Sequence, residues 1–465
     1  MEWPSKACRF RTRDFRAFKY EERSSRVITV RLDDTSDLEE AFVDEELTSS
    51  SDWESWLQRT ETDAKDDESN TLHIVLLRRT TKTVSECPSQ IHHVPVSQAT
   101  FKQITESFHT HRALARIITR KDTEFLYCLQ VNESFEPERL VYNYRTSATW
   151  PNDVAVSVTH DPKLRSTMAI FFGLDDGQEH TLMERMKDSL DDFYHPLALV
   201  GAVCEFERDR LVTEHARPME GRYLEKNLEW SSGSSESLAS GSETETMEDV
   251  LGLRFDSSFL LTGLTAARRQ LSRIVEHIEA LRKDDEMAAF MRGARYWASK
   301  EIKTGSGDAD RSRQLRHTAG RLQQRLNQIS DEFEMKLDSV RNSMEDMMAT
   351  TQVVISRIAR HDNQINMAIS VATRRDNSQM RSIAFVTMFY LPLTSIATIF
   401  SMNVFNWDAK DGENLMTTHF WLYLAVAGVS TVLTLGLWVF YTGMRTRLFL
   451  KKKDEEAAEA ESQTT

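Results

Sequence analysis

Two uncharged apolar runs near the C-terminal end limit what this chain can fold into more than any other feature of its sequence. The first extends from Ile383 to Phe400 (IAFVTMFYLPLTSIATIF) and the second from Phe420 to Tyr441 (FWLYLAVAGVSTVLTLGLWVFY). The hydrocarbon core of a bilayer is about 30 Å thick, and roughly 20 apolar residues of helix cross it. A buried helix in a soluble core is the alternative for each run, but too little chain follows them to build the core that two such helices need. The runs therefore predict a transmembrane hairpin.

The charges that flank the two runs predict the orientation of this hairpin. Segments rich in Lys and Arg stay on the inner side of a membrane. The connecting segment 401–419 has one Lys and three acidic residues, whereas the basic residues lie before the first run and after the second: Arg374, Arg375, Arg381, Arg445, Arg447 and Lys451 to Lys453. We therefore expect an integral membrane protein with two spans and both termini on the cytoplasmic side, or on the equivalent inner side of an organelle.

The composition excludes several classes of function. The 465 residues include 58 Lys and Arg against 72 Asp and Glu, a net charge of −14, so nucleic acid is not expected as a partner. No phosphate loop, HExxH, GxSxG or GxGxxG motif is found, and we predict no enzyme, no catalytic residue and no cofactor. Metal ligands stay unknown, because His92-His93 and His109-Thr110-His111 have no Cys, Asp or Glu beside them at ligand spacing. The four cysteines are far apart, which favours a reducing compartment: Cys8, Cys87, Cys128 and Cys204.

Residues 1–230 are predicted to form a cytoplasmic α/β domain, because strand-like and helical patterns alternate there. The strand-like runs are Arg26–Leu32, Leu72–Arg78, Phe125–Val131, Val154–Thr159 and Met168–Phe172. Helical patterns cover Phe101–Ile118, His180–Asp192 and a long stretch from His195 toward Glu229.

The remaining chain is predicted to be mainly helical. Residues 231–249 are rich in Ser, Glu and Gly and predict a disordered loop, and residues 250–308 predict cytoplasmic helices. Residues 309–382 predict a stalk helix. The stalk's apolar residues recur in an eleven-residue repeat, which is typical of a nearly straight helix. They form a narrow stripe that has to pack on its own domain, on other subunits or on both: Leu315, Leu322, Leu326, Ile329, Phe333, Leu337, Val340, Met344 and Met348. An ordinary coiled coil is the alternative for this helix.

After the stalk we expect four segments. They are the first span (383–400), an outer loop (401–419), the second span (420–441) and a basic then acidic cytoplasmic tail (442–465).

One motif at the end of the first span is specific. It consists of two short segments, Pro392-Leu393-Thr394 and, further along the chain, Met402-Asn403. This stretch resembles the CorA family of divalent-cation channels, whose first transmembrane helix contains Pro-Leu-Thr and ends in Gly-Met-Asn. Ser401 replaces the family glycine, and the family's acidic outer-loop motif Met-Pro-Glu-Leu is absent, so the chain is most similar to the divergent fungal-type branch grouped with CorA and the zinc transporter ZntB.

The resemblance implies a CorA-like fold: an α/β N-terminal cytoplasmic domain, a long helical stalk and two C-terminal transmembrane helices. It also implies a homo-oligomer, a pentamer in the family, surrounded by membrane lipid. The pore mouth and ion-selectivity residues would be Ser401, Met402 and Asn403, and the pore-lining residues would be Thr394, Leu391, Ile383 and Met380. Plain helix packing or lipid contact is the alternative for the second group.

The outer loop adds a cluster of acids that would attract cations to the pore mouth: Asp408, Asp411 and Glu413. A solvated loop is the alternative for these three residues. A ring of Asn403 amides would hold a hydrated ion through its water shell, which suits Mg²⁺ because this ion gives up water reluctantly.

Two functions are therefore considered. The first is a membrane channel or transporter for divalent metal cations, with Mg²⁺ expected first and Zn²⁺ or another ion next. The second is a non-transporting protein of CorA-like fold, in which the hairpin anchors a cytoplasmic interaction or scaffold domain.

Overall fold

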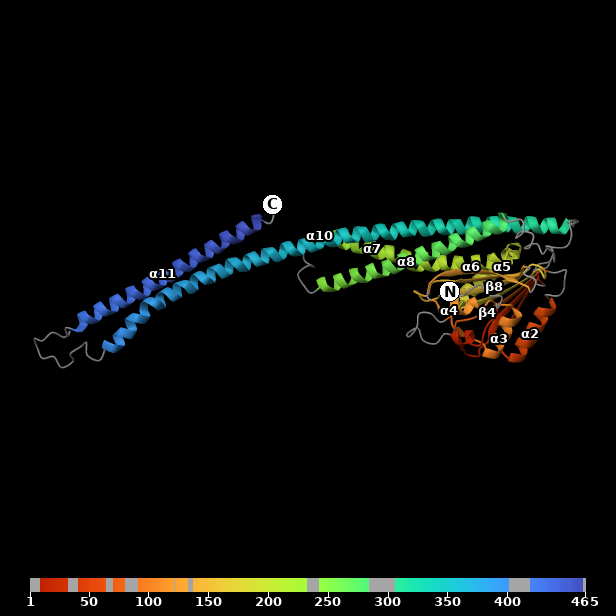
Figure 1. Cartoon of the computed structure of the whole chain (residues 1–465), viewed down its shortest axis with the longest axis horizontal. Helices are drawn as coiled ribbons and strands as arrows, with labels where there is room; N and C mark the ends of the chain where they lie inside the picture. The colour runs from red at the N-terminus through yellow and green to blue at the C-terminus, as the bar shows by residue number, and fades with distance from the viewer. Residues whose placement is uncertain are drawn as a thin grey trace, which may run out of the picture. The chain divides into compact units, whose positions relative to one another are not determined.

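The computed structural model describes residues 9–31, 41–63, 70–79, 91–120, 122–132, 137–231, 242–283, 306–400 and 419–462. The chain divides into two compact units, residues 1–351 and residues 352–465. The first unit is a sheet with helices on both faces, and the second contains the end of one long helix and the whole of another (Figure 1).

A seven-stranded mixed sheet forms the centre of the first unit. Its strands lie in the order β3-β2-β4-β9-β8-β7-β6; β4 and β9 pair in parallel, and every other neighbouring pair is antiparallel. The strands are β2 (Ser25–Arg31), β3 (Phe42–Leu47), β4 (Thr71–Leu77), β6 (Glu124–Val131), β7 (Pro137–Arg145), β8 (Ala155–Asp161) and β9 (Ser166–Phe172). A separate parallel pair joins β1 (Lys19–Tyr20) to β5 (His93–Val94). Every residue of β4, β8 and β9 is buried, as expected where both faces of a sheet are covered.

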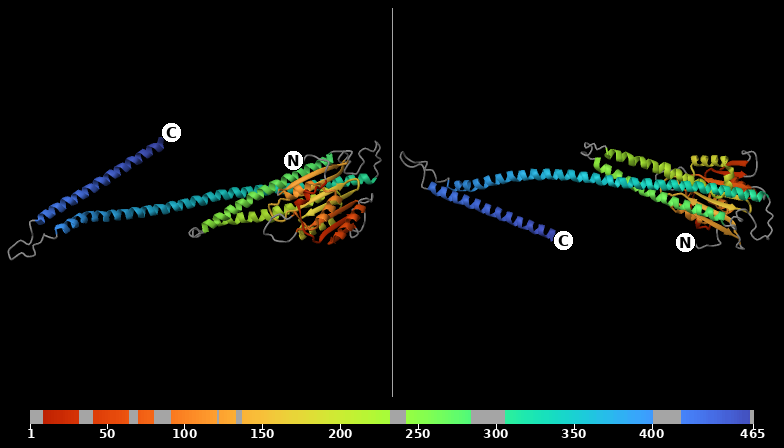
Figure 2. Two further views of the ribbon diagram at one scale, coloured as in Figure 1. Left: turned by 60° about the horizontal axis from the view of Figure 1, so that its bottom comes forward. Right: turned by 90° about the horizontal axis from the view of Figure 1, so that it is seen from above.

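Successive residues of the central strands pack into opposite layers. In β4, Ile74 belongs to one hydrophobic cluster and Val75 to the other, as the alternation of side chains along a strand requires. The layer on the Val75 side is built by α2 (Ser50–Asp63), α3 (Gln98–Ser107) and α4 (Ala113–Thr119). The two further views show helices on both sides of the sheet (Figure 2).

The layer on the Ile74 side is built from the later helices of the first unit. They are α5 (Asp176–Asp188), a 3-10 turn (Leu190–Tyr194), α6 (Leu197–Arg208), a π-helical segment (Asp209–Ala216), α7 (Arg217–Ser231), α8 (Ser242–Lys283) and the first part of α10 (Ser306–Phe400). The start of α5 is fixed by a capping box, in which Asp175 and Gln178 each accept a hydrogen bond from the other's backbone N–H.

The apolar stripe predicted for the stalk packs against this layer. Its middle residues are all buried in the main core: Leu326, Ile329, Phe333, Leu337 and Val340. Ion pairs hold α10 to α6 and α7, namely Arg208–Glu332 at 2.7 Å and Lys336–Glu220 at 2.8 Å. The stripe therefore packs on the chain's own domain here. Met348 is 42% exposed and Met347 is buried in its place, because a step of three residues from Met344 keeps the side chain on the inner face.

Several elements differ from the sequence prediction. The strands β3 (FVDEEL) and β7 (PERLVYNYR) were not predicted, because charged residues interrupt their alternation. The pattern over Phe101–Ile118 forms two helices, since His109 between them adopts a φ of 48°. Residues 242–249 belong to α8 rather than to the predicted loop. The long pattern from His195 contains the π-helical segment.

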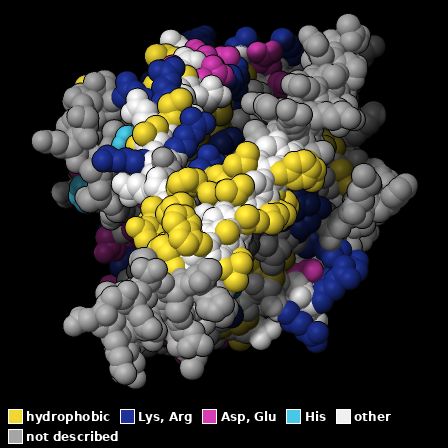
Figure 3. All heavy atoms as spheres, turned by 90° about the vertical axis from the view of Figure 1, so that its left-hand side faces the viewer, with side chains coloured by type: hydrophobic (Ala, Val, Ile, Leu, Met, Phe, Trp, Pro, Cys, Tyr) yellow, Lys and Arg dark blue, Asp and Glu magenta, His cyan; other side chains and the backbone are white. Residues whose placement is uncertain are grey.

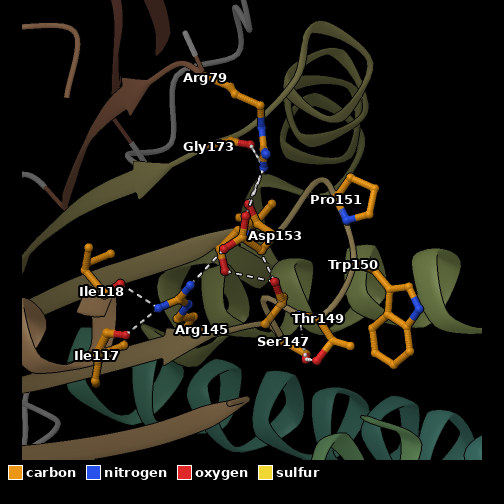
Figure 4. A network of polar contacts seen from close by, with 12 residues as sticks. Arg79, Ile117, Ile118, Arg145, Ser147, Thr149, Trp150, Pro151, Asp153 and Gly173 are labelled. Atoms are coloured by element: carbon orange, nitrogen blue, oxygen red, sulfur yellow. Dashed lines mark hydrogen bonds and ion pairs between the residues drawn. The ribbon is translucent and has the colours of Figure 1, made fainter. Parts of the chain in front are cut away.

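A buried polar network fixes the connection between β7 and β8 (Figure 4). One nitrogen of Arg145 lies 2.9 Å from Asp153, and another donates to the carbonyls of Ile117 and Ile118 at the end of α4. From the other side, Arg79 donates to the backbone oxygen of Asp153 at 2.5 Å. Burial lowers the pKa of both arginines, and the Asp153 carboxylate opposes that shift.

Candidate membrane-spanning helices and ion path

Among the described residues, two helices are long and apolar enough to cross a membrane by length and composition: α10, and α11 (His419–Ser462) over Phe420–Tyr441. Their apolar side chains are largely exposed, for example Val432 at 71%. Figure 3 looks from the side of Figure 1 on which α11 begins and shows hydrophobic side chains gathered together there. An apolar surface this extensive needs lipid or protein to cover it.

The two apolar segments contact each other along one face of each helix. Phe385 of α10 meets Trp438 of α11 edge to face, with ring centroids 6.2 Å apart. Tyr423 Oη approaches the backbone oxygen of Leu393 to 3.5 Å. Ala427, a small residue on the contacting face of α11, is 1% exposed. Small residues let membrane helices approach closely.

The four predicted pore-lining residues share one stripe of α10. At about 100° per residue, Met380, Ile383, Leu391 and Thr394 fall within an arc of about 80°. Met380 is 64%, Ile383 65% and Leu391 60% exposed, and Thr394 is also exposed. We call this stripe the open face of α10. It lies opposite the face that contacts α11 through Phe385.

Threonine hydroxyls extend this open face. Thr394 Oγ1 donates to the backbone oxygens of Tyr390 at 2.9 Å and Leu391 at 3.1 Å. Thr387 and Thr398, which fall on the same stripe, donate to their own helix in the same way. A hydroxyl that uses its proton in this way still has lone pairs to offer. Thr387 and Thr398 were not predicted from the sequence as part of this stripe, although their helical spacing from Thr394 could have indicated them.

Pro392 lies inside α10 beside these hydroxyls. Proline has no N–H, so the carbonyl four residues earlier lacks its usual helical donor. Such a freed carbonyl is tolerated in a membrane helix where hydroxyls or neighbouring helices lie close.

Charges before the span are divided between two faces of the same helix. By the same helical geometry, Asp376 and Asp362 lie in line with the open face. Arg374, Arg375 and Arg381 lie on the other side of α10. Both aspartates are exposed. An oligomer that turned the open faces inward would therefore place acids along its axis and arginines away from it.

The predicted pore mouth lies outside the described residues, which end at Phe400 and resume at His419. This applies to Ser401, Met402, Asn403, Asp408, Asp411 and Glu413. Within the described ranges, no group of three or more His, Cys, Asp or Glu residues is placed to hold a metal ion.

One family model and one curated protein match part of the chain. Residues 242–442 fit the family model described as "CorA-like Mg2+ transporter protein". The Notoamide biosynthesis cluster protein M' of Aspergillus versicolor is 36% identical over 84 residues, which cover 16% of this chain and 18% of that protein. The chain thus spans about a fifth of the length of this curated relative.

Two solved full-length structures also align with the chain. The CorA magnesium transporter from Methanocaldococcus jannaschii is 12% identical, with 88% of this chain and 96% of that one covered and a TM-score of 0.33. The full-length CmaX protein is 13% identical, with 91% and 98% covered and a TM-score of 0.35.

Proposed function

We propose that this protein carries divalent metal cations across a membrane, because residues 242–442 match the family model of CorA-like Mg²⁺ transporters. The cation is the cargo, and the proposal includes no catalytic step and no cofactor. Several copies, five by analogy with the family, surround the ion path. Both termini lie on the cytoplasmic side.

The observation that carries this proposal is the open face of α10. Its side chains point away from α11, which contacts the opposite face of α10 through Phe385 and Leu393. Lipid could cover an apolar stripe, but Thr387, Thr394 and Thr398 give this stripe a row of oxygen atoms. Copies that turn the open face inward would surround a path with an apolar throat and hydroxyl rings, and an apolar constriction gates by dewetting.

We further propose Mg²⁺ as the first cargo, with Zn²⁺ next. A ring of Asn403 amides at the outer mouth would contact the hydrated ion, whereas a carboxylate ring would bind it more strongly and release it more slowly. Serine enters the left-handed backbone region with strain that glycine avoids, so Ser401 would alter the shape of this mouth. Asp408, Asp411 and Glu413 outside, and Asp376 inside, would raise the local cation concentration at the two ends.

Uptake into liposomes that contain the purified full-length protein tests this function. We expect the wild type to admit Mg²⁺, and Asn403→Ala and Thr394→Val to reduce the uptake rate by about tenfold, as loss of a pore contact predicts. Thr434→Val is the matched control, because Thr434 on α11 makes the same hydroxyl-to-backbone bonds as Thr394. Wild-type protein that admits none of Mg²⁺, Zn²⁺, Co²⁺ or Ni²⁺ would refute the proposal.

A membrane-anchored scaffold is the second candidate, and Ser401 with the absent Met-Pro-Glu-Leu motif favours it. An anchor has no conduction path, so Thr394→Val and Asn403→Ala would leave all of its properties unchanged. Equal uptake by the wild type and both variants would reject the assigned pore residues.

A further inference from the structure

The first half of α8 carries apolar side chains on two opposite sides. Its inner side packs into the main core through Leu253, Leu260 and Leu264. Leu251, Phe255 and Phe259 recur at steps of four residues on the outer side, where Phe255 is 64% and Phe259 is 56% exposed. At about 100° per residue, Phe255 lies about 160° from Ser257, which bonds to Tyr223 in the core. We call Leu251, Phe255 and Phe259 the α8 face. A helix that is apolar all round is normally covered all round.

A second group of exposed apolar side chains lies across α7 and α10. It consists of Leu224 and Leu228 of α7 and of Met335 of α10, which is 72% exposed. Ser339 of α10 donates to the carboxylate of Glu220 of α7 at 2.7 Å and so holds the two helices together. Leu224 lies about 40° from Glu220 and Met335 about 40° from Ser339, in both cases on the outer side of this contact. We call Leu224, Leu228 and Met335 the α7–α10 face.

The two faces lie on different sides of the bundle that α7, α8 and α10 form (Figure 1). The ion pair Arg222–Asp256 at 3.4 Å holds α7 to α8, and Arg268–Glu334 at 2.8 Å holds α8 to α10. Arg222 lies about 160° from Leu224 around α7, so the α7–α10 face turns away from α8. The two faces therefore cannot form one patch within a single copy, and each offers its apolar surface to a partner.

The charges beside the two faces are of opposite sign. Two exposed arginines border the α8 face, Arg254 beside it and Arg269 further along the same side of α8. Two exposed acids border the α7–α10 face, Glu225 on α7 and Asp331 one turn before Met335 on α10. Opposite charges at the rims of two apolar patches steer the patches together and fix their register. The α7–α10 face is therefore complementary to the α8 face of another copy.

The number of different faces determines the symmetry of the contact. A face that binds the same face of another copy gives a two-fold dimer, whereas two different faces that bind each other give a head-to-tail contact that repeats around a ring. We infer that the α8 face of one copy packs on the α7–α10 face of the next copy, with Phe255 and Phe259 as its aromatic anchors. This inference rests on the several copies of the proposed function, but it does not require that they transport cations.

Cross-linking between two differently tagged full-length chains tests this contact. In chains whose four native cysteines are replaced, one chain carries Phe255→Cys and the other Leu224→Cys, and the co-expressed pair is treated in detergent with a short bismaleimide. We expect a dimer with both tags from the pair and no dimer from either chain alone, because each face meets only the other one. Phe255→Cys paired with Val43→Cys is the matched control and should give no dimer, since Val43 is exposed on the edge strand β3.

Two results would overturn the inference. One is a dimer from the Phe255→Cys chain alone, which would reveal a two-fold contact, and the other is the absence of a dimer from the mixed pair. Uptake of Mg²⁺ into liposomes by the same preparations separates the two proposals. Dimers without uptake of any divalent cation would refute the proposed function alone, and uptake without dimers would refute the contact alone.

A charge placed on the α8 face tests its role as the apolar anchor. We expect Phe259→Glu, added to the Phe255→Cys chain, to slow cross-linking to the Leu224→Cys chain about tenfold, as loss of an aromatic anchor predicts. Val43→Glu in the same chain should leave the rate unchanged. Equal rates with and without Phe259→Glu would exclude Phe259 from the contact.

Discussion

At the scale of single residues, the first unit keeps the charge of Arg145 inside its core by giving this side chain several partners. An unpaired buried charge costs several kcal/mol, which is why the removal of one partner of a buried pair is costly. Arg145 contacts Asp153 at 2.9 Å and also donates to the carbonyls of Ile117 and Ile118. The arginine therefore holds the end of α4 against the β7–β8 connection, which a hydrophobic side chain could not do.

Buried histidines are expected to lower the folding stability of the first unit at acid pH. His195 is buried, and its Nδ1 accepts the backbone N–H of Leu197 at 3.3 Å at the start of α6. Burial, with a smaller effect of the neighbouring His277, lowers the pKa of His195 to about 4. The unfolded chain then binds a proton at higher pH than the folded one. The stabilising effect is complete above the unfolded value of about 6.5 and is lost as the pH falls toward 4.

We expect the free energy of unfolding, measured with urea, to fall between pH 7 and pH 4.5, with His195 responsible for up to about 3 kcal/mol. The variant His195→Asn retains a side-chain acceptor for Leu197 but does not titrate, so its stability should depend less steeply on pH. Equal slopes for the two proteins would contradict this account of His195.

At the scale of elements, two glycines of α8 should respond in opposite directions to the same substitution. A Cβ on Gly263 would meet the ring of Trp150, whereas a Cβ on Gly252 would meet no heavy atom of the described residues within 4 Å beyond its own helix backbone. Overpacking typically costs about 1–3 kcal/mol, while replacing Gly by Ala in an open helix gains about 0.5–1 kcal/mol.

Thermal or urea unfolding of the two variants checks this contrast, and Gly252→Ala is the matched control. We expect Gly263→Ala to be less stable and Gly252→Ala more stable than the wild type. A Gly263→Ala protein as stable as the wild type would show that Trp150 does not pack on α8 as described.

The elements that the sequence predicted well are those with one clear period. The central strands β2, β4, β8 and β9 are apolar runs, and the stripe on the stalk helix repeats every three or four residues. The bounds of these strands were therefore predicted to within a few residues. The strand β3 was missed because its acidic residues face solvent at the sheet edge. The strand β7 was missed because it buries two polar residues, Asn143 and Arg145, and the carbonyls that accept from Arg145 belong to Ile117 and Ile118 at the end of α4.

The candidate ion path could be predicted only in part. Helical spacing alone places Met380, Ile383, Leu391 and Thr394 on one stripe, and the resemblance singled these residues out. The opposition between this stripe and α11 could not be predicted, because it depends on which face of α10 meets Phe385 and Trp438 in three dimensions. Asn403 and its neighbours stay predictions.

At the scale of the whole molecule, the two units have surfaces that suit different surroundings. The first unit covers its sheet with helices on both faces, whereas the second exposes apolar side chains along α10 and α11. A bilayer can cover the outward face of α11. The open face of α10 combines apolar side chains with threonine hydroxyls, and Asp362 and Asp376 lie in line with it.

Cysteine block of cation flux tests most directly whether the open face lines the path. In a chain whose four native cysteines are replaced, Leu391→Cys places a thiol on the open face and Val432→Cys places one on the exposed side of α11. We predict that a positively charged methanethiosulfonate reagent stops Mg²⁺ uptake into liposomes by Leu391→Cys protein and leaves Val432→Cys protein unaffected. Uptake by modified Leu391→Cys protein at the unmodified rate would contradict the account.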